Sequence, residues 1–126
     1  GAQLTVEVQP AQVRCAEGLL RQVLWNLVDN AIKYHRSEVP PAVEIRGHIA
    51  DGEYQLLVCD NGMGMSSEEV SHAFEPLYRG RRVEGINGTG LGLSLVKRVL
   101  EAAGGHVEVE SEVGRGTAFH IHVPRT

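Results

Sequence analysis

The sequence has few cysteines, no long apolar run and no strong excess of either charge. Its two cysteines, Cys15 and Cys59, lie far apart in the 126 residues, so one disulfide is possible but a free pair in a reducing compartment is the preferred interpretation. No run approaches the roughly 18 apolar residues of a membrane span, and no signal peptide is visible, so we expect the chain itself to be soluble. A net charge of −4 gives no indication of a nucleic-acid or acidic-membrane surface.

The length and the remaining composition are those of one globular domain. Apolar residues make up 42% and charged residues 22% of the chain, which is ordinary for a folded domain. We see no linker, internal repeat or low-complexity tract, so residues 1–126 are expected to form a single domain around a single core.

The stretch from residue 19 to residue 34 predicts an amphipathic helix. Apolar residues recur along it at spacings of three and four, namely Leu20, Val23, Leu24, Leu27, Val28 and Ala31. Asn26, Asn30 and Lys33 share a second face beside this stripe. Asparagine is a mediocre helix former, so two of them in one helix need a reason, and the simplest alternative to a functional one is a solvated helix edge.

Alternation with a period of two predicts strands over 4–8, 43–49, 54–60, 106–110 and 119–123. The pair Asp51-Gly52 predicts a tight turn between the second and third strands. A short helix over 66–74 and a longer one over 91–103 are also expected, the latter with Leu91, Leu95, Val99 and Ala102 on its apolar face and ended by Gly104-Gly105. The element order favours an α/β sandwich: a mixed sheet with its helices on one face.

Asp60 stands at the end of the third predicted strand. It has the same parity as Leu56 and Val58, so its side chain is expected on the sheet face that carries these apolar residues. If that face packs on the helices, the carboxylate lies at the floor of a cleft between the two layers. A carboxylate in such a place needs polar partners.

Four motifs stand in order along the chain: NLVDNAIKY (26–34), DNGMGM (60–65), FEPLYR (74–79) and GTGLGL (88–93), followed by the turn GRGT (114–117). In this order and spacing they resemble the N, G1, F and G2 boxes of the ATP-binding catalytic domain of sensor histidine kinases. That family belongs to the GHKL group, whose ATP-binding (Bergerat) fold is shared with type II topoisomerases and mismatch-repair ATPases. The resemblance covers residues 17–126 and implies a two-layer sandwich with a mixed five-stranded sheet and about three helices on one face.

The resemblance also implies a role for each matching residue toward Mg-ATP. Asn30 would be the Mg²⁺ ligand, Asn26 would contact the phosphates or a metal-bound water, and Lys33 would meet phosphate oxygens. Asp60 would accept a hydrogen bond from the adenine amino group, with Tyr34 as the aromatic neighbour of the base. Arg79 would reach the γ-phosphate. Together with the phosphate contacts of Asn26 and Lys33, this gives Asn26, Lys33 and Arg79 as the implied catalytic residues. The further nucleotide-binding positions are Gly62, Gly64, Gly88, Thr89, Gly90, Leu91, Gly92 and Thr117, and the segment 76–89 would form a lid over the nucleotide.

One departure separates two enzyme interpretations. ATP-hydrolysing relatives carry a water-activating Glu four residues before the metal-binding Asn, and this chain has Asn26 there. An amide cannot take a proton at neutral pH, so phosphoryl transfer to an external acceptor is favoured over hydrolysis. A GHKL-type ATPase, a serine kinase and a non-catalytic nucleotide-binding module remain the alternatives.

The six histidines lack the context of a phosphoacceptor. None is followed by Glu or Asp, so we expect the dimerisation and phosphoacceptor helices to be absent from the chain and the accepting histidine to lie on a separate domain of the same parent protein. The expected partners are that domain and a downstream response regulator, with the chain itself monomeric and cytoplasmic whether or not its parent is membrane-anchored. His120 and His122 have the spacing of a metal pair on one strand, but no third ligand is evident, so no metal is expected there.

Overall fold

The computed structural model describes residues 3–10, 13, 15–75 and 92–125. The elements follow in the predicted order. They are β1 (Gln3–Val8), α1 (Glu17–Lys33), β2 (Ala42–Ala50), β3 (Glu53–Asp60), α2 (Ser67–Ser71), α3 (Gly92–Ala102), β4 (His106–Glu112) and β5 (Gly116–Pro124).

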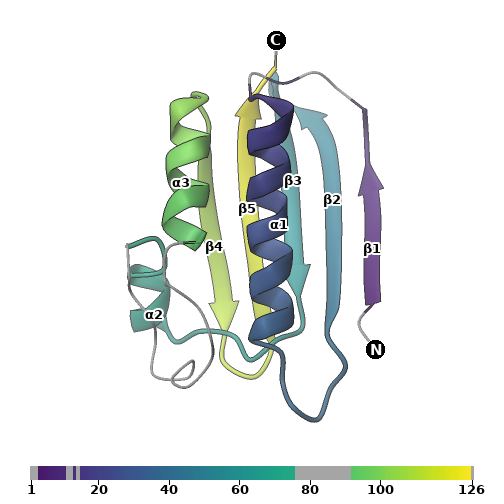
Figure 1. The fold of residues 1–126 in the computed structure, drawn as a ribbon, viewed down its shortest axis with the longest axis vertical. Helices are drawn as coiled ribbons and strands as arrows, with labels where there is room; N and C mark the ends of the chain where they lie inside the picture. Colours follow the sequence, from purple (N-terminus) through teal and green to yellow (C-terminus); the bar gives the residue numbers. More distant parts are fainter. Residues whose placement is uncertain (1–2, 11–12, 14, 76–91, 126) are drawn as a thin grey trace.

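The strands form one five-stranded sheet in the order β1-β2-β3-β5-β4. β1 runs parallel to β2, and every other neighbouring pair is antiparallel. The long helices α1 and α3 lie side by side on one face of this sheet, and α2 lies below the N-terminal end of α3 (Figure 1). The predicted two-layer sandwich with a mixed five-stranded sheet is therefore confirmed.

The core lies between the helices and the sheet. The apolar stripe predicted for α1 is confirmed, because Val23, Leu27 and Ala31 are buried and the other three members pack against the same core. From the sheet, the core takes alternate residues of β2, β3 and β5, including Leu56, Val58 and Ile121. In the described part of the chain, the helices cover only this face of the sheet (Figure 1).

The prediction of the apolar face of the second long helix, α3, is partly wrong. Val99 is buried as expected, but Val96 and Leu100 are completely buried while Ala102 is exposed. Two apolar stripes overlap in this helix, and spacing alone does not choose between them. The choice is made by tertiary contact, since α3 packs against α1 on one side and against β4 and β5 on the other.

The predicted turn at Asp51-Gly52 and the predicted end of α3 are confirmed, whereas the short helix α2 ends at Ser71 and not at residue 74. Asp51 and Gly52 both have positive φ, of 53° and 77°, as a two-residue turn between antiparallel strands requires. Gly104, with φ of 84°, ends α3, and the amide of Gly105 donates to the carbonyl of Leu100 at 2.8 Å. Ser66 caps α2 in a reciprocal capping box with Glu69.

Two expectations from composition can be compared with the structure. Cys15 and Cys59 are both free, and burial raises the pKa of each thiol, so neither has the thiolate character of a reactive cysteine. Among the residues that the structure describes, no helix is long and apolar enough to cross a membrane.

Candidate nucleotide-binding site

Three segments distant in sequence gather at one end of the sheet (Figure 1), and a fourth lies beside the middle of α1. The C-terminal end of α1, the chain leaving β3, and the turn between β4 and β5 lie together at the lower end of the molecule in Figure 1. The start of α3 is also close to α1, because an added Cβ on Gly92 would lie 4.0 Å from Cγ of Asn26. The structure therefore brings together residues of the N, G1 and G2 boxes and the final glycine turn.

Asp60 occupies the position predicted for it, at the end of β3 and in the parity of the buried residues Leu56 and Val58. Burial raises the pKa of its carboxyl group, while hydrogen bonds from the backbone amides of Gly62 and Thr117 act in the opposite direction. The amide of Gly62 donates to Oδ1 of Asp60 at 2.8 Å. The carboxylate is thus held by the backbone, partly removed from water, and able to accept from a ligand donor.

Gly62 has no room for a side chain. An added Cβ would lie 2.8 Å from the carbonyl oxygen of Tyr34 and 2.9 Å from Oδ1 of Asp60. The next amide, that of Met63, donates to the same Tyr34 carbonyl at 2.9 Å. The turn after β3 is therefore hydrogen-bonded to the end of α1. Tyr34 is half-buried, and its contact with adenine stays a prediction.

Gly64 and Gly116 are required by backbone packing. Gly64 has φ of 71°, and its added Cβ would lie 2.0 Å from the carbonyl oxygen of Glu112. Gly116 has φ of 125°, and its added Cβ would lie 2.0 Å from the carbonyl oxygen of Asp60. These glycines allow the turn after β3 and the β4–β5 turn to touch backbone against backbone, a role that is independent of any nucleotide.

Ser111 is a positioning residue that the sequence analysis missed. Its hydroxyl oxygen accepts from the amide of Met65 at 2.8 Å and contacts the carbonyl of Gly116 and the hydroxyl of Thr117, both at 2.8 Å. One signal was available, because Ser111 continues the inward parity of Val107 and Val109. A polar residue at the end of an apolar face indicates a local hydrogen-bonding task.

Asn61 was also missed as a positioning residue. Its Oδ1 accepts from the amide of Ala42 at 2.8 Å, and its Nδ2 donates to the carbonyl of Pro40 at 3.1 Å. The side chain of Arg36 donates to the Asn61 carbonyl at 3.0 Å. Asn61 thereby joins the turn after β3 to the chain entering β2.

Asn26 presents a buried polar atom without a partner. Its Nδ2 is shielded from solvent and forms no hydrogen bond within the described part of the chain. Leaving a buried amide group unpaired costs about 1–3 kcal/mol, so the atom needs an explanation other than folding stability. Asn30 follows one turn later and is half-buried, and its side chain supplies the kind of oxygen ligand that Mg²⁺ prefers.

Of the remaining predicted site residues, the structure describes Lys33 and Thr117 and leaves five others outside its described residues. Lys33 is exposed and pairs with Asp29 at 2.9 Å, so its ammonium group lies in a local ion pair and its contact with phosphate stays a prediction. Thr117 lies beside Asp60 as its partner in the sheet register. Five predicted residues, and the predicted lid over 76–89 with them, lie outside the described residues: Arg79, Gly88, Thr89, Gly90 and Leu91.

Comparison with known proteins identifies the family to which the chain belongs. Residues 15–126 match the family model described as "Histidine kinase-, DNA gyrase B-, and HSP90-like ATPase". The chain therefore belongs to this ATPase family.

The similar proteins narrow the class. The chain is 41% identical over 108 residues to the adaptive-response sensory kinase SasA of Gloeothece citriformis, which covers 86% of this chain and 27% of the relative. The mycobacterial sensor histidine kinase MprB superposes with a TM-score of 0.88 at 30% identity, over 98% of this chain and 84% of that structure. Full-length ShkA in complex with AMPPNP superposes with a TM-score of 0.82 at 30% identity, over 100% of this chain and 26% of that structure.

These matches agree with the site geometry and make the chain an ATP-binding catalytic domain of the histidine kinase type. The chain spans about a quarter of the length of the curated relatives it matches, since the shares of the first two are 27% and 28%.

Proposed function

We propose that the chain binds Mg-ATP and transfers its γ-phosphoryl group to a histidine on a separate dimerisation and phosphoacceptor domain of the same parent protein. A response regulator would then receive the phosphoryl group. Support for the partners comes from the chain itself, because none of its six histidines is followed by the acidic residue of the phosphoacceptor motif.

The observation that carries the nucleotide assignment is the Asp60 carboxylate. It is partly buried, its pKa is raised by that burial, and Gly62 holds one of its oxygens at 2.8 Å. An ionised carboxylate accepts hydrogen bonds and donates none. The 6-amino group of adenine is a donor, whereas guanine presents a carbonyl oxygen at the same edge, so this site favours adenine over guanine.

The residues of α1 fit a magnesium triphosphate. Asn30 would hold the metal through its amide oxygen, and the Nδ2 of Asn26, which has no partner among the described residues, would donate to a phosphate oxygen. The Oδ1 of Asn26 could instead accept from a metal-bound water. A bound Mg²⁺ would supply charge neutralisation at the phosphates. The AMPPNP complex of the similar kinase ShkA supports the assignment of the nucleotide.

Asn26 also favours transfer over hydrolysis. Its amide cannot act as a base at neutral pH, and water activation needs a group that can take the proton. Bound ATP is therefore expected to be hydrolysed slowly and to transfer its phosphoryl group to an acceptor from outside the domain. This distinguishes the proposal from that of a GHKL-type ATPase.

Radiolabelled ATP tests the proposal directly. The chain alone should bind nucleotide and carry no label on histidine, while the chain mixed with the dimerisation and phosphoacceptor domain of its parent should label that domain. Asn30→Ala should abolish the labelling without loss of the folded state. Label on a histidine of the chain itself, or phosphate release without an acceptor as its main reaction, contradicts the proposal.

A further inference from the structure

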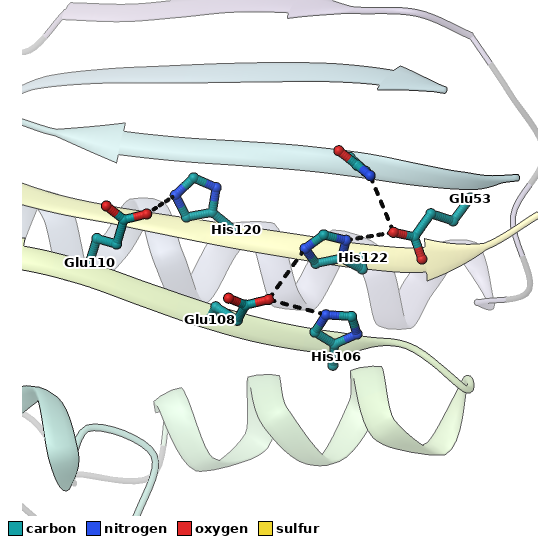
Figure 2. Close-up of polar contacts among 7 residues, drawn as sticks. Glu53, His106, Glu108, Glu110, His120 and His122 are labelled. Atoms are coloured by element: carbon teal, nitrogen blue, oxygen red, sulfur yellow. Dashed lines mark hydrogen bonds and ion pairs between the residues drawn. The ribbon is translucent and has the colours of Figure 1, made fainter. Parts of the chain in front are cut away.

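The face of the sheet opposite the helices carries a cluster of histidine and glutamate side chains. Figure 2 shows it from that side, with the helices behind the sheet and the side chains rising from β3, β4 and β5. The cluster has two parts: His120 pairs with Glu110 at 3.0 Å, and His122 lies among His106, Glu108 and Glu53. The sheet register creates the second part, because His106 is the direct cross-strand partner of His122.

We propose that His106, Glu108 and His122 form a binding site for a divalent transition metal ion of the Zn²⁺ type. One ligand atom from each of the three residues can be chosen so that all three lie within 4.8 Å of one another. Oε1 of Glu108 is 3.3 Å from Nε2 of His106 and 3.7 Å from Nε2 of His122. A tetrahedral ion with ligands at about 2.0–2.1 Å keeps its ligand atoms about 3.3 Å apart, so the trio is already close to the spacing of a coordination shell.

Glu53 prepares His122 for this role. Oε1 of Glu53 is 2.6 Å from Nδ1 of His122, and since an ionised carboxylate only accepts, Nδ1 must be the donor. The neutral ring then has its lone pair on Nε2, the atom that faces Glu108. A carboxylate that fixes the outer nitrogen of a histidine ligand is the usual supporting contact in metal sites, and His122, with a side chain only 20% exposed, is held in place.

His106 must move for the ion to enter. Its ring stacks on that of His122, with ring centroids 4.1 Å apart and an angle of 8° between the planes. In parallel rings the two nitrogen lone pairs do not converge on one point. The side chain of His106 is 54% exposed, so it can rotate until its Nε2 points at the position shared with Glu108 and His122.

The ligand chemistry selects the metal. Two imidazole nitrogens and one carboxylate oxygen suit Zn²⁺ and its neighbours in the transition series, while Mg²⁺ and Ca²⁺ prefer oxygen ligands alone. Three protein ligands leave a fourth position for water or a partner's ligand. The ion would tie β4, which is an edge strand, to β5, and would do so on the sheet face opposite the nucleotide site.

Calorimetric titration of the whole chain with Zn²⁺, without nucleotide or Mg²⁺, tests the site. We expect one saturable site, a raised melting temperature through mass action, and selective shifts of the Nε2 resonances of His106 and His122 in NMR spectra. His106→Ala should weaken Zn²⁺ binding at least tenfold. Glu53→Ala, which removes the acceptor that orients His122, should weaken it by about 10- to 100-fold.

Matched controls keep the result specific. His120→Gln changes a histidine on the same strand and face that lies outside the trio, and Cys59→Ser removes a thiol of the neighbouring strand. Both variants should bind Zn²⁺ as the unchanged chain does. Absence of saturable binding, or equal losses in His106→Ala and His120→Gln, overturns the proposal, and full retention of binding in His106→Ala does so as well.

Discussion

The two faces of the sheet are made by the same strands and have opposite chemistry. On β5, Ile121 points toward the helices and is completely buried, while its neighbours His120 and His122 point to the other face and pair with glutamates. The helix-covered face is stabilised by apolar packing, and the candidate nucleotide site lies at one end of it. The opposite face, which carries no helix in the described part of the chain, has polar pairs. Such pairs contribute little to stability when exposed but offer ligand atoms.

Substitutions at adjacent positions of β5 give the largest contrast between the faces. Ile121→Ala should lower the free energy of unfolding by about 2–5 kcal/mol, because it leaves a cavity in a fully buried part of the core. His120→Ala should lower it by less than about 1 kcal/mol, since it removes a partly exposed pair with Glu110. Urea denaturation of both variants measures the difference, and similar losses would show that the two faces do not divide the stability in this way.

Asn30→Ala tests the function of the covered face without disturbing its core. Asn30 is half-buried and is the predicted Mg²⁺ ligand. We expect Mg²⁺-dependent ATP binding to weaken at least tenfold, or about 1.4 kcal/mol, with an unchanged unfolding transition. Titration with ATP in the presence and absence of Mg²⁺ separates the metal-dependent part. An unchanged Mg²⁺ dependence removes Asn30 from the metal site.

Asn26→Ala should affect stability and binding in opposite directions. The substitution removes an amide whose buried Nδ2 has no hydrogen-bond partner among the described residues and adds a better helix former, so we expect the fold to be stabilised by about 1 kcal/mol. Nucleotide affinity should fall, because the amide is kept for the ligand. A variant that is both less stable and fully able to bind nucleotide would assign Asn26 to the fold.

Asp60→Asn should give the smallest effect, visible as a change with pH. The raised pKa of Asp60 means that the folded chain holds this proton more tightly than the unfolded chain. Its contribution to stability is therefore largest below the ordinary value of 3.8 and decreases as pH rises from there through the folded pKa. The free energy of unfolding of Asp60→Asn, relative to the unchanged chain, should rise over the same window. A difference that is constant from pH 3 to pH 7 contradicts a buried, titrating Asp60.

Sequence patterns predicted the helix-covered face of the sheet better than the histidine-bearing face, because they record burial along one element but not the register between two strands. Apolar periodicity identified the stripe of α1 and the parity of β3, and so placed Asp60, because burial imposes these patterns along a single element. The His106–His122 contact depends on the register between two strands, and no pattern within either strand contains that register. Thus the trio with Glu108 was not found, although the spacing of His120 and His122 drew attention to the strand.

The same distinction holds within the nucleotide site. Motif residues such as Gly62 could be identified by resemblance. Ser111 and Asn61, in contrast, position the site through hydrogen bonds to distant segments. The overlapping stripes of α3 were likewise decided by packing against α1 and the sheet. Residues that belong to a sequence motif can be identified from the sequence, whereas residues that act through contacts with distant segments can be identified only from the tertiary structure.

We have proposed that Asp60 makes this an adenine-specific site, and titration of the chain with ADP and with GDP measures that selectivity. Pairing the guanine carbonyl with a partly desolvated carboxylate costs about 1–3 kcal/mol or more, so ADP should bind roughly tenfold to a hundredfold more tightly than GDP. Asp60→Ala should lose most of the ADP affinity without gaining affinity for GDP. Equal affinities of the unchanged chain for ADP and GDP would contradict the role of Asp60 and, with it, the assignment of the site.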